Sequence, residues 1–425
     1  MPRLSTRRIS DRMHRMLAAA VIVGVLSTSA CVAAPPRPPA PAAAVRLTLG
    51  TLLPGAANPG DVGPRTGAAI ALAVADIAAA RAGITVTTIS ADGSATDPQS
   101  AVAAAANAAA ALLTGGVTAV IGAAASGLST ATIDRFSRAG VVQLSPIDGA
   151  SELSTTPDAG LFWRTAPSDI LRGRALGNRI LADGALRVGI LYSNDSVGTA
   201  THTGVAEALT AGGAAAVSEI FEPGAIDFAG PLDRILRITP DAIVVISGSE
   251  LRGIATELQA RTFDLKRLYG DDRNVGVLEG AAVDAVGARF SVAGAVTPPA
   301  LEARLPPLIP TGSPSPTGAA VIDRSFAPEA YDATVLLALA SLEARSNGGT
   351  VIASRLRDVS SGGTRCTSFA ACARMIAVQT NIDYDGQSGR IPWTDRGDIA
   401  DAQTRIFRFA DGNIPVFSGL AQSAR

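Results

Sequence analysis

The chain has 425 residues, 47% of them hydrophobic and 17% charged, which is enough for about two to three domains with a sizeable buried core. The formal net charge is −1 and no basic patch stands out, so nucleic acid is not expected as a partner. Only two histidines occur, His14 and His202. Because histidine is the commonest general base and metal ligand, this composition argues against an enzyme and against a metal or cofactor site.

The N-terminus predicts export. Five arginines precede an apolar stretch from Met16 to Ala30, which suits a signal peptide and is too short to span a membrane. The sequence LSTSAC resembles a bacterial lipobox that ends at Cys31, with Thr28 where leucine is usual. We therefore expect a lipoprotein signal peptide at residues 1–31 and lipid on Cys31. Ordinary cleavage nearby, which would remove this cysteine or leave it free, is the alternative.

A tether follows the signal peptide. Residues 32–45 contain five prolines among alanines and favour an extended, semi-rigid spacer. A lipid and this spacer would hold a folded domain at the outer face of the cytoplasmic membrane or in the periplasm.

A first series of short apolar strands alternates with helical stretches. The expected strands are 45–54, 84–91, 117–122 and 141–146, and the expected helices are 66–80, 99–113 and 128–140. Strands of this kind, separated by helices, are typical of βαβ units around a parallel sheet.

A second series starts after LFWRTAPSD. The expected helices are 170–184, 201–213, 228–238 and 250–261, and the expected strands are 187–193, 217–222, 241–248, 267–272 and 287–299. A long helix at 328–345, a shorter one at 350–358 and a hairpin-like tail at 389–417 follow. The sequence thus predicts an α/β protein of two units with central parallel sheets, in which the last helices return to the first unit.

Two cysteines remain after Cys31, in the sequence CTSFAAC. An exported chain with Cys366 and Cys372 left over predicts a disulfide between them. Half of a metal site is the alternative, but no histidine lies near and the spacing is not that of a zinc site.

Several segments, in this order, resemble the type I periplasmic binding proteins of the leucine/isoleucine/valine-binding branch. They are VTAVIGAAASGLSTATIDRFSRAGVVQLSPIDGASEL, LFWRTAPSD, EAYDATVLLALASL and IDYDGQSGRIPWTDRGD. The resemblance covers nearly all of Val45 to Phe417. It implies two Rossmann-like lobes joined by three crossover segments, near Arg164–Pro167, Gly294–Pro298 and Asp385–Asp398.

The same resemblance implies how the lobes divide the chain. The first lobe would comprise 46–165 and 298–385, and the second 166–297 and 386–425. Because ligands in open α/β sheets lie beyond the carboxyl ends of the strands, the two lobes would enclose a ligand between them.

One end of the ligand would meet the first lobe. Ser126, just after a strand and at the start of a helix, matches the family's carboxylate-binding serine, and a helix N-terminus binds anions. A helix cap formed by Ser126 or Ser129 is the alternative. In the next loop, Ile147 matches a backbone carbonyl contact and Gly149 stands where a threonine is usual. The alternative there is a turn built on Asp148 and Gly149, and Asp148 would disfavour a ligand carboxylate.

The other end would meet the second lobe. Asp272 in LYGDDRNV matches the acid that pairs with a ligand ammonium, the alternative being a loop in which Asp271, Asp272 and Arg273 pair with one another. Val197 and Ser249 stand where aromatic side chains are usual, so the site would be more polar or roomier than a leucine site. Tyr331 keeps a family tyrosine, which elsewhere often only packs a helix.

The resemblance therefore implies a solute-binding lipoprotein of an ABC importer. It would bind a small polar molecule such as an amino acid or an amide and deliver it to a permease in the cytoplasmic membrane. A lipoprotein of the same fold that binds a partner as a regulator or sensor is the alternative. Neither interpretation calls for catalysis.

Overall fold

The computed structural model describes residues 44–53, 63–93, 98–123, 126–310, 323 and 325–424. The predicted signal peptide, the lipidation site at Cys31 and all of the predicted tether but its last two residues lie outside these ranges. None of the helices within them is long and apolar enough to cross a membrane.

The first lobe is built on a five-stranded sheet in the order β2-β1-β3-β4-β5, and every strand pair in it is parallel. Its strands are β1 Val45–Leu53, β2 Ile84–Asp92, β3 Ala119–Gly122, β4 Val142–Ser145 and β5 Phe162–Arg164. The helices that alternate with them are α2 Gly63–Ala80, α3 Pro98–Thr114 and α4 Ser126–Arg138. The βαβ alternation predicted for this part of the chain is confirmed.

The second lobe is built on a seven-stranded sheet in the order β14-β13-β10-β9-β8-β6-β7. Its parallel strands are β6 Arg187–Ser193, β7 Ala215–Phe221, β8 Ala242–Ile246, β9 Leu268–Gly270 and β10 Arg289–Val292. Its helices are α5 Asp169–Ala182, α6 Ser196–Ala211, α7 Ala229–Leu236 and α8 Leu251–Ala260. All five residues of β8 are buried, as expected for an apolar strand covered on both faces.

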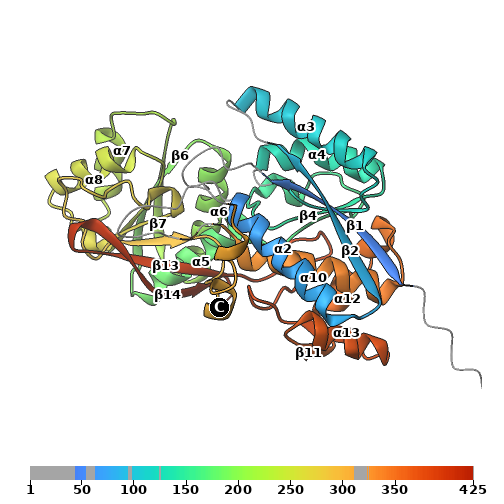
Figure 1. Ribbon diagram of the computed structural model, residues 1–425. Helices are drawn as coiled ribbons and strands as arrows, with labels where there is room; N and C mark the ends of the chain where they lie inside the picture. Colours follow the sequence, from blue (N-terminus) through green and yellow to red (C-terminus); the bar gives the residue numbers. More distant parts are fainter. Residues whose placement is uncertain are drawn as a thin grey trace, which may run out of the picture. The chain divides into compact units, whose positions relative to one another are not determined.

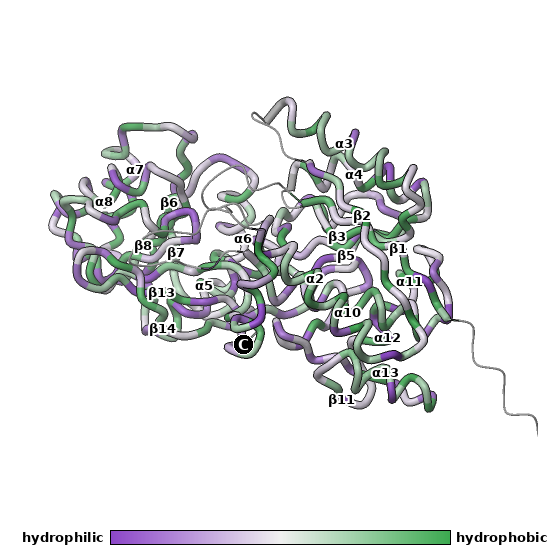
Figure 2. The backbone as a smooth tube through the Cα atoms, in the orientation of Figure 1, coloured by the Kyte–Doolittle hydropathy of each residue, from purple (hydrophilic) through white to green (hydrophobic). Residues whose placement is uncertain are grey.

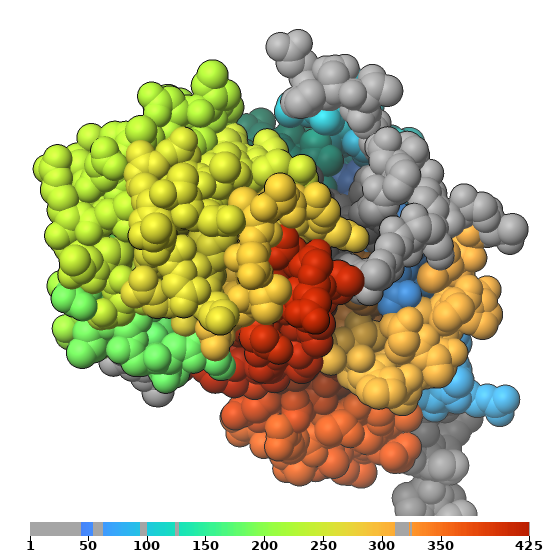
Figure 3. Space-filling view, turned by 90° about the vertical axis from the view of Figure 1, so that its left-hand side faces the viewer, coloured from blue at the N-terminus to red at the C-terminus, as the bar shows by residue number. Residues whose placement is uncertain are grey.

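The C-terminal tail is a hairpin that extends this second sheet. β13 Gln403–Ala410 and β14 Ile414–Gln422 pair antiparallel, and β13 also pairs antiparallel with β10. In the space-filling view of Figure 3 the red C-terminal segment accordingly lies against the yellow segment that leads to β10.

The helices after β10 pack on the first lobe. They are α9 Pro299–Glu302, α10 Ala327–Ala344, α11 Gly349–Ala353, α12 Leu356–Ser360 and α13 Phe369–Ala377, with a two-stranded sheet of β11 Thr364–Cys366 and β12 Ile382–Tyr384. Figure 1 shows α10 beside α2, and Figure 2 shows both helices as largely hydrophobic. Every residue of α10 from Ala327 to Ser341 is buried, which is typical of a helix enclosed on all sides.

One expected helix is in fact two. The stretch 350–358 forms the end of α11 and the start of α12, which are separated by Ser354 and Arg355. The disulfide prediction is confirmed, because the structure joins Cys366 at the end of β11 to Cys372 in α13.

Within the described residues the chain passes between the two lobes three times. β5 leads to α5 through residues 165–168, β10 leads to α9 through 293–298, and β12 leads to β13 through 385–402. The third crossing stays on the first lobe for much of its length, since Ile391, Trp393 and Ile399 belong to that lobe's hydrophobic core. Trp163 packs edge-on against Trp393 with 5.1 Å between ring centroids, so this tryptophan has a packing role.

Candidate ligand-binding site

The predicted site residues follow the carboxyl ends of parallel strands, where loops of neighbouring strands lie close together. β3 and β4 lead to α4 and to the loop 146–150, while β8 and β9 lead to the loops that hold Ser249 and Asp272. The site can therefore be described as two groups of loops, one from each lobe, and the contacts between them.

A carboxyl group from the loop after β4 lies beside the first turns of α4. α4 begins at Ser126, whose side chain lies outside the described residues. One turn later, the hydroxyl of Ser129 donates to Asp148 Oδ2, and the hydroxyl of Ser145 lies 3.3 Å from the same oxygen. Asp148 is only 2% exposed. A buried carboxyl group thus lies beside the first turns of this helix, where the helix dipole favours the ionised form of an acid.

The loop after β4 contacts the second lobe through its glycine. The carbonyl of Gly149 accepts a hydrogen bond of 2.7 Å from the backbone N–H of Asp169, at the start of α5. A Cβ atom on residue 149 would lie 2.4 Å from Asp169 Oδ1. No side chain fits there unless Asp169 moves, which explains why glycine replaces the threonine usual in the family. Ile147 is half-buried in the same loop.

An arginine connects this loop to Asp272. Arg172 donates to Asp169 Oδ1 and to Asp272 Oδ1, each at 2.8 Å, and is itself buried. Gly149, Asp169, Arg172 and Asp272 therefore form a continuous chain of contacts from one predicted site loop to the other. Burial raises the pKa of Asp169 even though Arg172 lies beside it. The Asp272 side chain is 20% exposed and remains accessible.

A second arginine repeats this arrangement nearby. Arg273 contacts Asp271 Oδ2 and Asp195 Oδ2, each at 3.0 Å. Asp195 also caps α6 by accepting the Gly198 N–H at 2.6 Å. Burial raises the pKa of Asp271 to about 7, against the lowering effect of Arg273. Of the pairs foreseen within the 271–273 loop, the structure thus forms Asp271–Arg273, while Asp272 pairs with a residue from α5.

The other predicted site residues lie in different environments. Val197 is half-buried in the first turn of α6, and Ser249 is exposed in the loop after β8. Tyr331 is buried in the core of the first lobe, where its hydroxyl donates to Asp76 of α2 at 2.7 Å. We therefore leave Tyr331 out of the site, because its polar group is used in packing α10 against α2.

Three charged residues of this site were missed from sequence, namely Asp169, Arg172 and Asp195. The first two are three apart at the start of a helix, a spacing that places side chains side by side. That signal is common on helices, and only the fold shows that Arg172 also reaches Asp272. In the described part of the chain, no three or more His, Cys, Asp or Glu side chains come together as a possible metal site.

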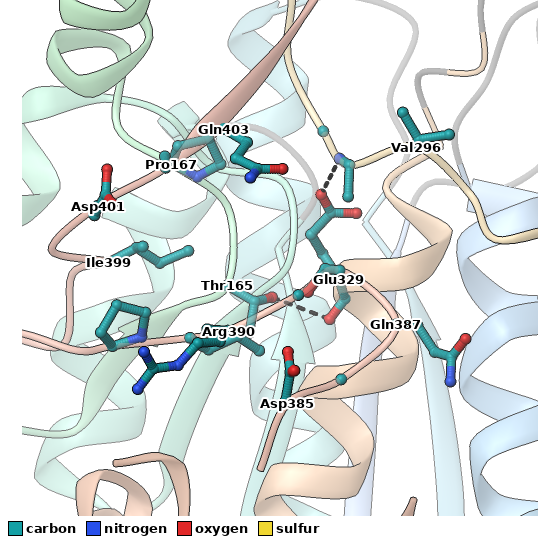
Figure 4. Close-up of a pocket in the computed structure, with 18 of the residues that line it drawn as sticks. Thr165, Pro167, Val296, Glu329, Asp385, Gln387, Arg390, Ile399, Asp401 and Gln403 are labelled. Carbon is teal, nitrogen blue, oxygen red and sulfur yellow. Dashed lines mark hydrogen bonds between the residues drawn. The ribbon is translucent and has the colours of Figure 1, made fainter. Parts of the chain in front are cut away.

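The three crossings meet at the start of α10, around a cavity of about 560 Å³. Glu329, only 2% exposed, accepts a 2.6 Å hydrogen bond from the Ala295 N–H in the second crossing. Its backbone carbonyl accepts from the hydroxyl of Thr165 in the first crossing at 3.0 Å, and Figure 4 shows both bonds. Burial raises the pKa of Glu329 to about 7.

The third crossing is held one turn further along α10. The buried Asp332 accepts hydrogen bonds from the Tyr384 hydroxyl, from the Gln387 N–H and from both the N–H and the hydroxyl of Ser388, at 2.6–2.8 Å. A Cβ atom on Gly386 would lie 2.2 Å from the same carboxylate. Glu329 and Asp332 of α10 thus contact all three crossings between them. The crossings are the segments about which one lobe would move relative to the other.

Two lobes, one on a parallel sheet and one on a mainly parallel sheet, are joined by three crossings, which is the type I fold of periplasmic binding proteins. The model of the periplasmic binding protein family matches residues 46–305. The chain belongs to this family, as its motifs predict. No curated protein matches its sequence.

Solved structures share this fold at low sequence identity. A leucine-binding protein from Thermotoga maritima is 19% identical with a TM-score of 0.60, over 88% of this chain and 98% of that one. A substrate-binding protein of an ABC transporter from Desulfitobacterium hafniense, in complex with leucine, is 21% identical with a TM-score of 0.62, over 88% and 100%. A solute-binding protein from R. palustris in complex with benzoate is 18% identical with a TM-score of 0.58, over 88% and 96%.

Proposed function

We propose that this protein is the extracytoplasmic solute receptor of an ABC importer. It binds a small polar molecule between its two lobes, and the ligand-bound form docks on a permease in the cytoplasmic membrane. The observation that carries this proposal is the chain of contacts from Gly149 through Asp169 and Arg172 to Asp272, which brings the loops of both lobes to one place. Family membership and the ligands named for the structural relatives support it.

In this proposal Asp272 receives the positive or hydrogen-bond-donating end of the ligand. Its carboxylate is partly exposed, and it shares Arg172 with a second acid, Asp169. Ser126, the loop carbonyl of Ile147 and the backbone of Gly149 line the opposite side, with Val197 and Ser249 at the edges. A ligand that contacts Asp272 and the first-lobe loops together would favour a closed arrangement of the lobes, because only that arrangement makes both sets of contacts.

The test is a thermal-shift screen followed by calorimetry against amino acids, amides, amines and small organic acids. A ligand at a hundredfold excess over its Kd should stabilise the folded protein by about 2.7 kcal/mol. Asp272→Asn should weaken a ligand that bears a donor or cation by about 1.5–3 kcal/mol, through loss of a charged hydrogen bond. Ser126→Ala should cost less, since the backbone N–H groups of α4 remain.

Asp233→Asn is the matched control. Asp233 lies on α7, is largely exposed, and pairs with Arg261 at the surface, so this variant should bind as the wild type does. Failure of every class of solute to stabilise the protein would contradict the proposal and favour a partner-binding lipoprotein. Tight leucine binding that tolerates Asp272→Asn would contradict the role given to this acid.

A further inference from the structure

Glu329 joins the core helix of the first lobe to the second crossing. It lies in the first turn of α10, is 2% exposed, and accepts the Ala295 N–H on Oε1 at 2.6 Å. Its other carboxyl oxygen, Oε2, is buried and accepts no hydrogen bond from the described part of the chain. A buried carboxylate is costly unless it is fully hydrogen-bonded, so this acid is poorly placed to carry a charge.

The carboxyl group of Glu329 borders the cavity of about 560 Å³ between the three crossings. Thr165 of the first crossing, Ala295 of the second and Gln387 of the third line the same cavity, and Figure 4 shows them around Glu329. Because Oε2 itself is not exposed, water can reach this oxygen only if a crossing moves away from α10. Hydration of the acid is therefore coupled to release of a crossing.

Two charged side chains act on Glu329 from neighbouring positions. Arg405 of β13 favours the ionised acid, while Asp332, one turn further along α10, disfavours it. The guanidinium of Arg405 also donates to the backbone carbonyls of Ala293 and Asp323. Burial outweighs the lowering effects of the Ala295 N–H and of Arg405, and raises the pKa of Glu329 to about 7.

The other charged side chains around the cavity and the crossings have different partners. The ion pairs are Asp385 with Arg365, Arg390 with Asp383, Arg164 with Asp398 and Asp323 with Arg65. Asp401 accepts the Ser423 hydroxyl and the Ala424 N–H. Arg405 is thus the base that acts on Glu329, and the described arrangement leaves the second carboxyl oxygen without a donor.

We propose that Glu329 is a proton-sensitive clamp between α10 and the second crossing. The neutral acid holds residues 293–297 on the first lobe, and its ionisation favours release of this segment, because only release lets water reach both carboxyl oxygens. Since the lobes move about the crossings, the clamp makes this movement easier as pH rises. The clamp acts without a ligand, so its test is independent of the proposed function.

The expected pH dependence follows from the two states of the acid. In the released segment the pKa of Glu329 returns toward its ordinary value of 4.5, whereas in the held segment it is about 7. The released form therefore binds fewer protons between these values. The equilibrium constant for release should increase by up to about tenfold for each pH unit in this window, and should level off above it.

Hydrogen–deuterium exchange, followed by mass spectrometry, measures this equilibrium in the exported protein without ligand. Exchange is compared at pH 5, 6, 7 and 8 and corrected for the intrinsic effect of pH on amide exchange. Protection of a peptide that covers 293–297, and thus the Ala295 N–H, should decrease about fivefold or more per unit from pH 5 to 7 and less than about threefold from pH 7 to 8. A peptide from β8, all of whose residues are buried, reports global unfolding.

Glu329→Gln keeps an acceptor for the Ala295 N–H and cannot ionise, so protection of the 293–297 peptide should no longer change with pH. Glu329→Met serves the same purpose if the glutamine variant does not fold, because the criterion is the slope with pH and not the level of protection. Glu207→Gln is the matched control. Glu207 is partly exposed on α6 and pairs with Arg174, so this variant should keep the wild-type slope.

Three results would each overturn the clamp. Protection of the wild-type peptide could be independent of pH between 5 and 7. The slope could survive in Glu329→Gln, which would assign it to another group such as Asp332, whose pKa is raised to about 6 by burial. The 293–297 peptide could also be protected as strongly as the β8 peptide, which would mean that only global unfolding releases the second crossing.

Discussion

At the scale of single residues, the absence of a side chain at Gly149, in the loop after β4, determines how closely Asp169 can approach. Gly149 lets Asp169 approach the loop closely, and Asp169 in turn holds one side of Arg172. Asp148 turns inward to two serines. Two consecutive residues thus set the packing of this loop on α5 and its contacts with Ser129 and Ser145.

Gly149→Thr would introduce the hydroxyl usual in the family at a position that has no room for it. The new Cβ would lie 2.4 Å from Asp169 Oδ1, so this carboxylate must move and its bond to Arg172 is disturbed. We expect the free energy of unfolding to decrease by roughly 1–3 kcal/mol, the usual cost of overpacking, as measured by urea denaturation.

Gly127→Ala is the control for this variant. A Cβ at Gly127, in the same lobe and at the second position of α4, would meet nothing within 4 Å. Replacing a helical glycine with alanine at an open position should leave stability unchanged or raise it slightly. Equal stability of Gly149→Thr and the wild type would show that the contact with Asp169 does not restrict this loop.

At the scale of elements, α10 combines two roles. Its apolar residues form the centre of the first lobe, and its first turns carry Glu329 and Asp332, which hold the crossings. A fully buried acid is costly unless it is hydrogen-bonded. Backbone N–H groups of the crossings bond both carboxyl oxygens of Asp332 and one of the two carboxyl oxygens of Glu329. The helix therefore fixes the crossings to the lobe whose core it forms.

Stability should depend on pH through Glu329. The unfolded chain releases this proton near pH 4.5, whereas the folded protein holds it up to a pKa of about 7. The folded state therefore binds more protons between these values, and the free energy of unfolding should decrease as pH rises through this window. The full effect is about 3 kcal/mol at pH 8.

Glu329→Gln removes this titration and keeps an oxygen that can accept the Ala295 N–H. Thermal denaturation between pH 5 and pH 8 should show a flatter profile for this variant and a higher stability than the wild type at pH 8. A variant profile as steep as that of the wild type would assign the pH dependence to other groups.

The disulfide closes a short loop from β11 to α13. Cys366 and Cys372 are six residues apart, and the chain-entropy model gives roughly 2 kcal/mol for a loop of this length. Reduction with dithiothreitol should lower the free energy of unfolding by about this amount. The double variant Cys366→Ser, Cys372→Ser should be as unstable as the reduced wild type, whether or not dithiothreitol is present. If dithiothreitol also lowered the stability of the double variant, its effect could not be assigned to this disulfide.

At the scale of the whole molecule, the described chain forms two lobes on two sheets. The two sheets differ in construction, because the first is wholly parallel and the second ends in an antiparallel hairpin. The hairpin brings the C-terminus of the chain into the second lobe, so that this lobe is completed only after the third crossing. The two lobes are consequently not independent segments of the sequence.

Lipid on Cys31 would restrict the receptor to a membrane surface. If the lipobox-like sequence is used, Cys31→Ala should move the exported protein from the membrane fraction to the soluble fraction, as measured by fractionation and immunoblotting. The lipid-specific mass should also disappear from the mature N-terminal peptide. Unchanged membrane association of the variant, without that mass, would show that another contact holds the protein at the membrane.

Much of the architecture follows from local patterns in the sequence. Apolar strands that alternate with helices predicted the α/β class and the two successive sets of strands and helices that form the lobes. The short spacing of two cysteines, in a chain expected to be exported, predicted the disulfide. Motif order predicted the family. These features depend on residues close together in the chain, where periodicity and turn chemistry act directly.

The chemistry of the site was decided by tertiary structure. The resemblance suggested Asp272 as a site residue and left open whether Asp148 would intrude. The sequence did not show that Arg172, a hundred residues earlier, bridges Asp272 to Asp169. It likewise placed Tyr331 among site residues, whereas the packing of α10 on α2 directs its hydroxyl to Asp76. Charge pairing and burial depend on which distant segments meet, because the energy of a carboxylate is set by its neighbours in space rather than by its neighbours in the chain.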